Sequence, residues 1–274
     1  MANGPAIGTV VAIWRYPVKS MQGEELSTSP VDERGLLGDR GYALVHAEDG
    51  KVASAKNPRK WPHLFEFRTG YPEAPVSGRP LPLVRITLPD GSVHTGGAAG
   101  TDAALSTAVG RPVSLRAAVP EKPVLEEYWP DIDGLAHRET VTDEKMPENT
   151  FFDVGIVHLL TTAALQALAE SYPQGKFEVR RFRPNIVVAP ATGTRGFVEN
   201  DWVERTLRLG DEVRLQITMP CGRCVMTTLP QGDLPRDTSI LRTAVQQNQG
   251  NVGVYARVVR GGIVRQGDTV TIDG

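Results

Sequence analysis

Glycine and proline recur along the whole length of this chain and divide it into short segments. The 274 residues include 28 glycines and 21 prolines, and these are spread out rather than gathered in one linker-like run. Both residues favour turns and interrupt regular structure. The sequence therefore predicts many short elements joined by turns, in one large domain or in two smaller domains packed closely together.

Strand patterns outnumber helical patterns in these segments. Hairpin turns are expected at residues 48–50 and 89–91, which read Glu-Asp-Gly and Pro-Asp-Gly. Because strands and helices do not alternate regularly, we expect a β-rich, barrel-like α+β fold. Strands are expected over 10–16, 41–46, 51–54, 85–88, 92–95, 113–118, 157–160, 186–188, 207–209, 213–217, 252–258 and 263–272. The three expected helices have as N-caps Thr101 or Asp102 (for residues 101–109), Thr161 or Thr162, and Asp237 or Thr238.

The stretch over residues 120–149 is polar and acidic, contains prolines and shows little periodicity. It is predicted to be a long connection, of a length that in compact proteins is usually functional or mobile. We place a domain boundary at its start. This gives an N-terminal domain over residues 1–119 and a C-terminal domain over residues 120–274.

The charges of the chain are nearly balanced. The formal net charge is -2, with 40% hydrophobic and 23% charged residues, so the composition gives no reason to expect a nucleic-acid or membrane partner. No segment has the apolar length of a membrane-spanning helix, and the first residues lack the pattern of a signal peptide. We therefore expect a cytoplasmic protein. The glycine fingerprint of dinucleotide-binding proteins and the Walker-type phosphate loop are both missing from the sequence.

The only two cysteines, Cys221 and Cys224, lie together in Pro-Cys-Gly-Arg-Cys. A zinc site needs further soft or imidazole ligands at regular spacing, and no second pair exists. A thioredoxin-like pair opens a helix, whereas this pair follows a strand ending at 219–220 and precedes a β-prone run over 225–229. Two interpretations remain: a single thiolate ligand to a soft metal, kept ionised by Arg223, or a buried pair without a chemical role.

Three further clusters place cations on short turns next to strands. They are Tyr-Pro-Val-Lys-Ser over residues 16–20, Gly-Asp-Arg-Gly over 38–41 and Arg-Arg-Phe-Arg-Pro-Asn over 180–185. Each cluster alone is typical of a solvated surface, where cations pair with carboxylates. Together they offer the groups that an anionic, phosphate-bearing ligand requires, because arginine binds phosphate in a bidentate manner and lysine adds a point charge.

At these four clusters the chain resembles the MOSC family, named for the C-terminal domain of molybdenum cofactor sulfurase. The motifs look most like those of the branch that contains the mitochondrial amidoxime-reducing component and its bacterial relatives. The resemblance covers nearly the whole chain and implies an N-terminal β-barrel-like domain packed on a MOSC β-barrel domain with a few helices. It also implies a molybdopterin cofactor between the two halves, with its molybdenum held by Cys224. The residues that match the family's cofactor-binding positions are Lys19, Ser20, Arg40, Arg183, Asn185 and Arg223.

One pair of residues departs from the family's pattern. After the Phe-Asp at 152–153, the amidoxime-reducing branch has a Thr-Ser pair that helps to hold the cofactor, whereas this chain has Val154 and Gly155. Two hydroxyl donors are therefore missing. The backbone amide of Gly155 is the cofactor-binding group that we expect in their place.

The resemblance implies an oxidoreductase that reduces N-hydroxylated small molecules such as amidoximes, hydroxylamines or N-oxides, with Cys224 at its catalytic centre. Because the chain has no further cysteines for an iron–sulfur cluster, electrons are expected from a separate flavin, haem or iron–sulfur protein. One alternative is a carrier that transfers sulfur or the cofactor through a Cys224 persulfide or thiolate. Another is a binding module without activity. The resemblance assigns no role to Cys221.

Overall fold

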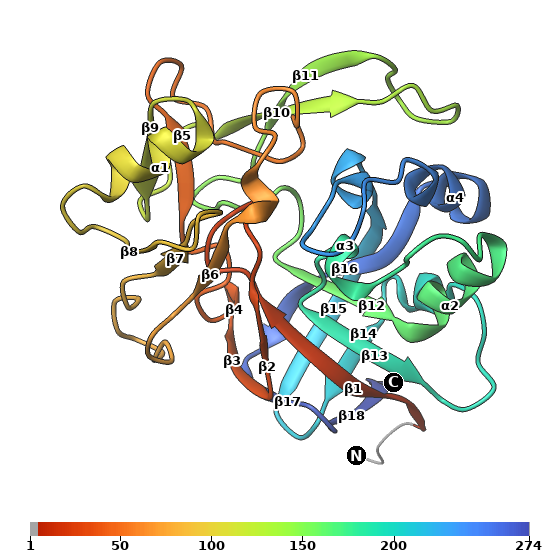
Figure 1. The fold of residues 1–274 in the computed structure, drawn as a ribbon. Coiled ribbons are helices and arrows are strands. Elements are labelled where there is room, and N and C mark those ends of the chain that lie inside the picture. The colour runs from red at the N-terminus through yellow and green to blue at the C-terminus, as the bar shows by residue number, and fades with distance from the viewer. Residues whose placement is uncertain (1–4, 274) are drawn as a thin grey trace.

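The fold is organised around a sheet that closes on itself. In the computed structural model, which describes residues 5–273, seven strands form a closed barrel in the order β13-β12-β16-β15-β14-β18-β1, and β1 also pairs with β13 (Figure 1). The pairs are antiparallel except β12–β13, which is parallel. The barrel strands are β1 (Ala6–Arg15), β12 (Val157–Thr161), β13 (Ile186–Pro190), β14 (Thr206–Leu209), β15 (Val213–Gly222), β16 (Asn251–Arg260) and β18 (Thr269–Asp273).

The barrel interior is filled by branched aliphatic side chains that alternate along the strands, as expected for sheets with one buried face. On β15, Val213, Leu215 and Ile217 are each 0% exposed and belong to this core. The short strand β2 (Glu24–Leu26) extends the sheet beyond β1. Because β1 has barrel strands on both sides, the end of β1, where residues 16–20 follow, lies within the body of the molecule.

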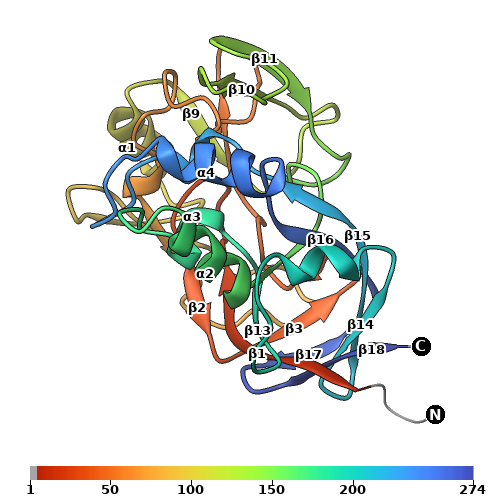
Figure 2. The ribbon, with the colours of Figure 1, turned by 90° about the vertical axis from the view of Figure 1, so that its right-hand side faces the viewer.

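Three short helices cover one side of the barrel: α2 (Thr162–Ser171), α3 (Val179–Phe182) and α4 (Ser239–Asn248) (Figure 2). They share an apolar core with β12 and β16 that includes Leu160, Leu168 and Phe182. Thr161 caps α2, because its hydroxyl accepts a hydrogen bond from the Ala164 amide at 3.1 Å. The predicted cap of α2 is thus confirmed.

The remaining elements form small sheets beside the barrel: β3 (Thr28–Asp32) with β4 (Gly35–Leu36) and β17 (Gly262–Arg265), β5 (Ala43–His46) with β9 (Val113–Arg116), and β6 (Arg68–Gly70) with β7 (Arg85–Thr87) and β8 (Val93–Thr95). The β5–β9 and β6–β7–β8 sheets, together with α1 (Thr101–Val109) and the 3-10 helix η1 (Leu64–Glu66), enclose a second apolar core. Val31, Leu36 and Val264 of the β3–β4–β17 sheet belong to the barrel core instead. Val225, Met226 and Leu229, just after Cys224, insert into this second core. The chain around Cys224 therefore packs against residues from the beginning of the sequence.

Residues 120–149 are not the unstructured connection that we expected. They form an antiparallel hairpin of β10 (Val124–Trp129) and β11 (Thr140–Lys145), seen at the top of Figures 1 and 2. In β11 none of the six residues is buried. A strand without a buried face does not need alternating apolar and polar residues, and the sequence of β11 therefore lacks the pattern by which strands are predicted. The proposed boundary at residue 119 stays a prediction.

The β-rich α+β fold and the helix over 101–109 are confirmed, as is the 89–91 hairpin between β7 and β8. Four local predictions were wrong. The expected strand over residues 51–54 is reduced to an isolated bridge between Val45 and Val52. Gly100, in a left-handed conformation, is the N-cap of α1 and makes no side-chain cap bond. Residues 263–272 are divided between β17 and β18, and the expected strand over 225–229 is largely the 3-10 helix η3 (Val225–Thr228). A further 3-10 helix is η2 (Val198–Trp202).

At the third expected cap, Thr238 is the N-cap of α4 without a side-chain bond, and the Asp237 carboxylate accepts a hydrogen bond from the Ser239 amide at 2.9 Å. Within residues 5–273, no helix combines the length and the apolar character needed to cross a membrane.

Candidate functional site

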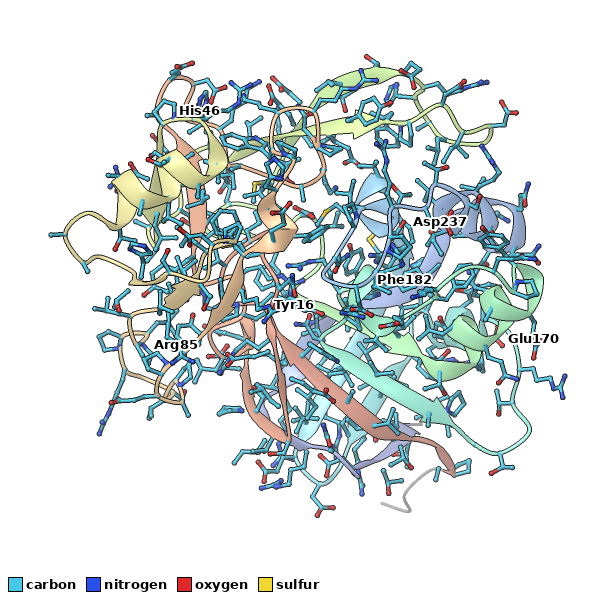
Figure 3. All side chains as sticks on the ribbon, viewed as in Figure 1. Tyr16, His46, Arg85, Glu170, Phe182 and Asp237 are labelled. Carbon is cyan, nitrogen blue, oxygen red and sulfur yellow. The ribbon has the colours of Figure 1, made fainter. Side chains whose placement is uncertain are left out.

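A cavity of about 200 Å³ lies where the barrel meets the elements from the beginning of the chain. Segments that are distant in sequence contribute to its wall, among them the turn after β1, the turn after β4, the loop before β12, the turn before β13 and the end of β15. Figure 3 shows Tyr16 and Phe182 near the centre of the molecule, from two of these segments. All eight residues of the predicted site line this cavity: Lys19, Ser20, Arg40, Gly155, Arg183, Asn185, Arg223 and Cys224. Their convergence is confirmed, while their roles toward a ligand stay predictions.

Lys19 is 5% exposed and points at the loop before β12. Its ammonium group donates to the Phe151 carbonyl at 3.0 Å and forms an ion pair with Asp153. Burial lowers the pKa of Lys19, and Asp153 partly offsets this effect. Burial alone would raise the pKa of Asp153, but Lys19 and then Lys56 hold it well below its usual range. The only carboxylate among the residues lining the cavity therefore stays ionised and is shared by two lysines.

Arg40 and Arg183 converge on the ring of Tyr16, with guanidinium carbons 4.4 and 4.1 Å from its centroid. Both arginines have the left-handed backbone conformation, at φ 47° and 53°, which turns the chain sharply beside the cavity. Burial, and then the neighbouring Arg40, lowers the pKa of Arg183 to about 10. Arg183 therefore remains charged at neutral pH. The two cations repel each other, so a bound anion between them would be stabilising.

The side chains of Asn185 and Ser20 form hydrogen bonds with other groups of the protein. The Asn185 amide donates to Asp39 at 2.9 Å, and its oxygen accepts from the backbone of His158 at 3.1 Å. The Ser20 hydroxyl accepts from the Ala55 amide at 3.0 Å. These two residues fix the turns that bear the cations, in addition to lining the cavity.

The two cysteines lie in different surroundings. Cys221 is within β15 and 0% exposed, whereas Cys224 is partly exposed and lines the cavity. Arg223 donates to the Cys221 sulfur at 2.7 Å. As expected, Arg223 also lowers the pKa of Cys224, but by less than burial raises it. Burial and the Glu127 carboxylate raise the pKa of Cys224 to about 11. The free Cys224 thiol is therefore protonated at neutral pH.

Several residues that the sequence did not single out also line the cavity, among them Lys56, Asp153, His158 and Tyr255. The Lys56 ammonium contacts Glu127 at 2.8 Å and Asp153 at 3.9 Å. Lys56 stands alone in a loop without a motif, so nothing in the sequence marks it. Asp153 belongs to the Phe-Asp pair that precedes Val154, and that pair was the available signal.

The donor set fits an anionic ligand that also carries a soft metal. Five cations line the cavity, Lys19, Arg40, Lys56, Arg183 and Arg223, against one carboxylate. The Nε donor of Arg223 is buried and has no partner among the described residues, as expected where the acceptor belongs to a ligand. Over residues 5–273 no group of three or more His, Cys, Asp or Glu side chains is placed to hold a metal ion. Cys224 contributes the only thiol among the residues that line the cavity, beside the weaker thioether donors of Met219 and Met226.

The chain is similar to known proteins over most of its length. Residues 148–271 match the family model described as MOSC domain, and residues 7–104 match the model described as MOSC N-terminal beta barrel domain. The mitochondrial amidoxime reducing component 2 of Rattus norvegicus is 25% identical over 96% of this chain and 83% of that protein. The mitochondrial amidoxime-reducing component 1 of Xenopus laevis is 28% identical over 96% and 82%, and the component 2 of Homo sapiens is 29% identical over 81% and 67%.

Proposed function

Since the chain belongs to the MOSC family, with both the MOSC domain and its N-terminal barrel domain, we propose that it is a molybdenum cofactor-dependent reductase of N-hydroxylated compounds. The single observation that supports this proposal best is the convergence of five cations and one cysteine thiol on one cavity. The names of the similar proteins, amidoxime-reducing components, point to the same class of reaction.

Different residues of the cavity have different proposed roles. Lys19, Arg40 and Arg183 would bind the phosphate of the cofactor, since they come from three separate segments and face one cavity. Cys224 would bind the molybdenum as a thiolate. Because its pKa is about 11 without metal, metal binding must displace the thiol proton, and cofactor loading should become more favourable as the pH rises. When bound, the cofactor supplies the two-electron chemistry that removes oxygen from nitrogen.

The alternative role, a carrier that uses a Cys224 persulfide, receives less support. Persulfide formation and transfer require a thiolate, and burial keeps the Cys224 thiol protonated at neutral pH. Mass spectrometry of metal-free protein after exposure to a sulfur donor tests this directly. A stable persulfide at Cys224, together with no reduction of benzamidoxime by molybdenum-loaded protein, would favour the carrier.

The purified, cofactor-loaded protein is expected to reduce benzamidoxime with a reduced viologen dye, and not with NADH or NADPH alone. The sequence has no dinucleotide fingerprint and only two cysteines, so an internal relay from a nicotinamide to the cavity has no groups to use. Turnover is measured by the benzamidine formed, with heat-treated protein as control. Steady NADPH-driven turnover in a preparation free of other proteins would overturn this prediction and reveal a missed site of electron entry.

Restoring one of the two missing hydroxyls should help cofactor retention, and restoring the other should not. Val154 is 50% exposed, so Val154→Thr adds a donor at the cavity without repacking, and we expect up to about 10-fold more retained molybdenum. A Cβ atom at Gly155 would lie 2.6 Å from the Tyr255 ring. Gly155→Ser must therefore displace that ring, which we expect to cost about 1–3 kcal/mol of stability. The two variants are compared by their molybdenum content after gel filtration and by the thermal unfolding of their metal-free forms. Equal molybdenum content and equal stability of the two variants would show that the distinction is wrong.

A further inference from the structure

The other cysteine of the chain, Cys221, is not among the residues that line the cavity, yet it contacts one of the cavity's cations. Cys221 is 0% exposed, and its sulfur accepts a hydrogen bond from Nη1 of Arg223 at 2.7 Å. We propose that Cys221 is the buried anion that positions the Arg223 guanidinium in the wall of the cavity. The purpose of that positioning, holding the anionic cofactor, rests on the proposed function. The pairing itself does not.

Arg223 is fixed at two of its three nitrogens. Nη1 donates to the Cys221 sulfur, and Nη2 donates to the Phe182 carbonyl at 2.7 Å. A guanidinium is planar and rigid, so these two contacts determine where the third nitrogen, Nε, points. Nε has no partner among the residues that the structure describes. The two contacts therefore leave one donor of a fixed direction for an acceptor that the protein does not provide.

A negative charge on Cys221 is what makes this arrangement stable. Moving the Arg223 charge out of water is costly unless an opposite charge accompanies it, and Arg223 makes no ion pair with a carboxylate of the described chain. His158 of β12 and Tyr255 of β16 also stabilise a negative charge on the sulfur, since both lower the pKa of Cys221. Groups from Arg223, from the neighbouring strand β16 and from β12, the next strand beyond it, thus act on the sulfur.

The same neighbours act on the acidity of the thiol. Burial alone would raise the pKa of Cys221, but Arg223, His158 and Tyr255 outweigh burial and lower it to about 6. The further charged groups that face these neighbours are Asp153, which acts on Tyr255, and Glu199, which is electrostatically coupled to His158. The two cysteines, three residues apart, are therefore in opposite protonation states at neutral pH: Cys221 is ionised, and the metal-free Cys224 is not.

The first experiment needs no molybdenum. In the Cys224→Ser variant only one thiol remains, so the ultraviolet absorbance of thiolate, measured against pH, reports on Cys221 alone. The double variant Cys221→Ser/Cys224→Ser is the matched blank. We expect a midpoint near pH 6, and a midpoint at least one unit higher when Arg223→Gln is added. Arg223→Lys keeps the positive charge, so its midpoint should lie between those of the Arg223 protein and the Arg223→Gln variant. This variant is measured in place of Arg223→Gln if Arg223→Gln does not fold. A midpoint of about 8.5, as for an ordinary thiol, or a midpoint that does not change when Arg223 is substituted, would overturn the proposal.

The second experiment asks whether the pair serves cofactor binding. Proteins made in cells that synthesise molybdopterin are compared for molybdenum content per chain. Loss of a residue that orients a ligand-binding group costs about 10–100-fold in affinity, so we expect a strong decrease for Cys221→Ala. Cys221→Asp, which restores an anion, should recover more molybdenum than Cys221→Ser, which restores only size.

The two experiments separate this inference from the proposed function. If Cys221→Ser recovers as much molybdenum as Cys221→Asp, the positioning role is wrong, even if the absorbance titration shows that Cys221 is a thiolate. If the wild-type chain retains no molybdenum at all, the proposed function fails, and the absorbance titration still decides whether Cys221 and Arg223 form an ion pair.

Discussion

The Cys224→Ala variant is expected to lose all molybdenum-dependent reduction of amidoximes, while Cys221→Ala keeps a measurable part of it. Cys224 lines the cavity, and Cys221 is buried in β15 behind Arg223. Removing the only thiol that lines the cavity would leave the proposed metal without its thiolate ligand. Removing a residue that acts through another lowers metal affinity by about 10–100-fold. The first loss should exceed this range, and the second should fall within it.

The measurement compares benzamidoxime turnover and molybdenum content for both variants and the wild type, with a viologen dye as electron donor. Dividing turnover by molybdenum content separates the loss of the metal from the loss of its reactivity. Equal and complete loss in both variants would point to a dithiol mechanism and would contradict the division of roles between the two cysteines.

Arg181→Ala is expected to destabilise the fold severely, whereas Arg180→Ala should change stability by less than about 1 kcal/mol. Arg181 is 0% exposed, and its guanidinium donates to four backbone carbonyls, those of Lys176, Thr227, Leu229 and Pro235. Truncation leaves buried carbonyls without donors and a cavity, each a recognised source of large losses. We expect about 3 kcal/mol or more.

Arg180 provides the matched control, since it precedes Arg181 in the same short helix and forms partly exposed ion pairs with Glu178 and Asp233. Urea unfolding followed by tryptophan fluorescence compares the two variants. Because the Arg181 contacts hold the residues that follow Cys224, the Arg181→Ala protein should also retain less molybdenum. A small, similar change in both variants would show that the four carbonyls find other donors.

The arginine cluster shows which parts of the site can be predicted from the sequence and which cannot. Residues 180–185 were predicted as one cationic group, and the structure divides them: Arg180 lies at the surface, Arg181 in the core and Arg183 at the cavity. In the four-residue helix α3 successive side chains are rotated by about 100° from each other, and the left-handed Arg183 that follows turns the chain again. Neighbouring side chains are therefore separated in space. A motif identifies the segment that reaches the site, and the backbone conformation decides which of its side chains arrives there.

Other features of the site could not be predicted for physical reasons. Lys56 and Tyr255 reach the cavity from segments without a motif. The β10–β11 hairpin was missed because its outer strand has no buried residue. The run over 225–229 has the composition of a strand, but Val225, Met226 and Leu229 anchor it in the core formed by the beginning of the chain. In that position tertiary packing overrides local preference.

The closure of the barrel by β1 also has a consequence for how the protein is made. Strand β1 pairs with β18, and these strands come from opposite ends of the chain. During synthesis β1 leaves the ribosome early and can pair with β2, but its barrel partner β13 follows more than 150 residues later and β18 later still. Meanwhile its unpaired edges are open to other chains, and pairing over so long a separation is slow. Yield in a host cell should therefore depend on chaperone supply and expression temperature, even for variants whose finished fold is as stable as the wild type.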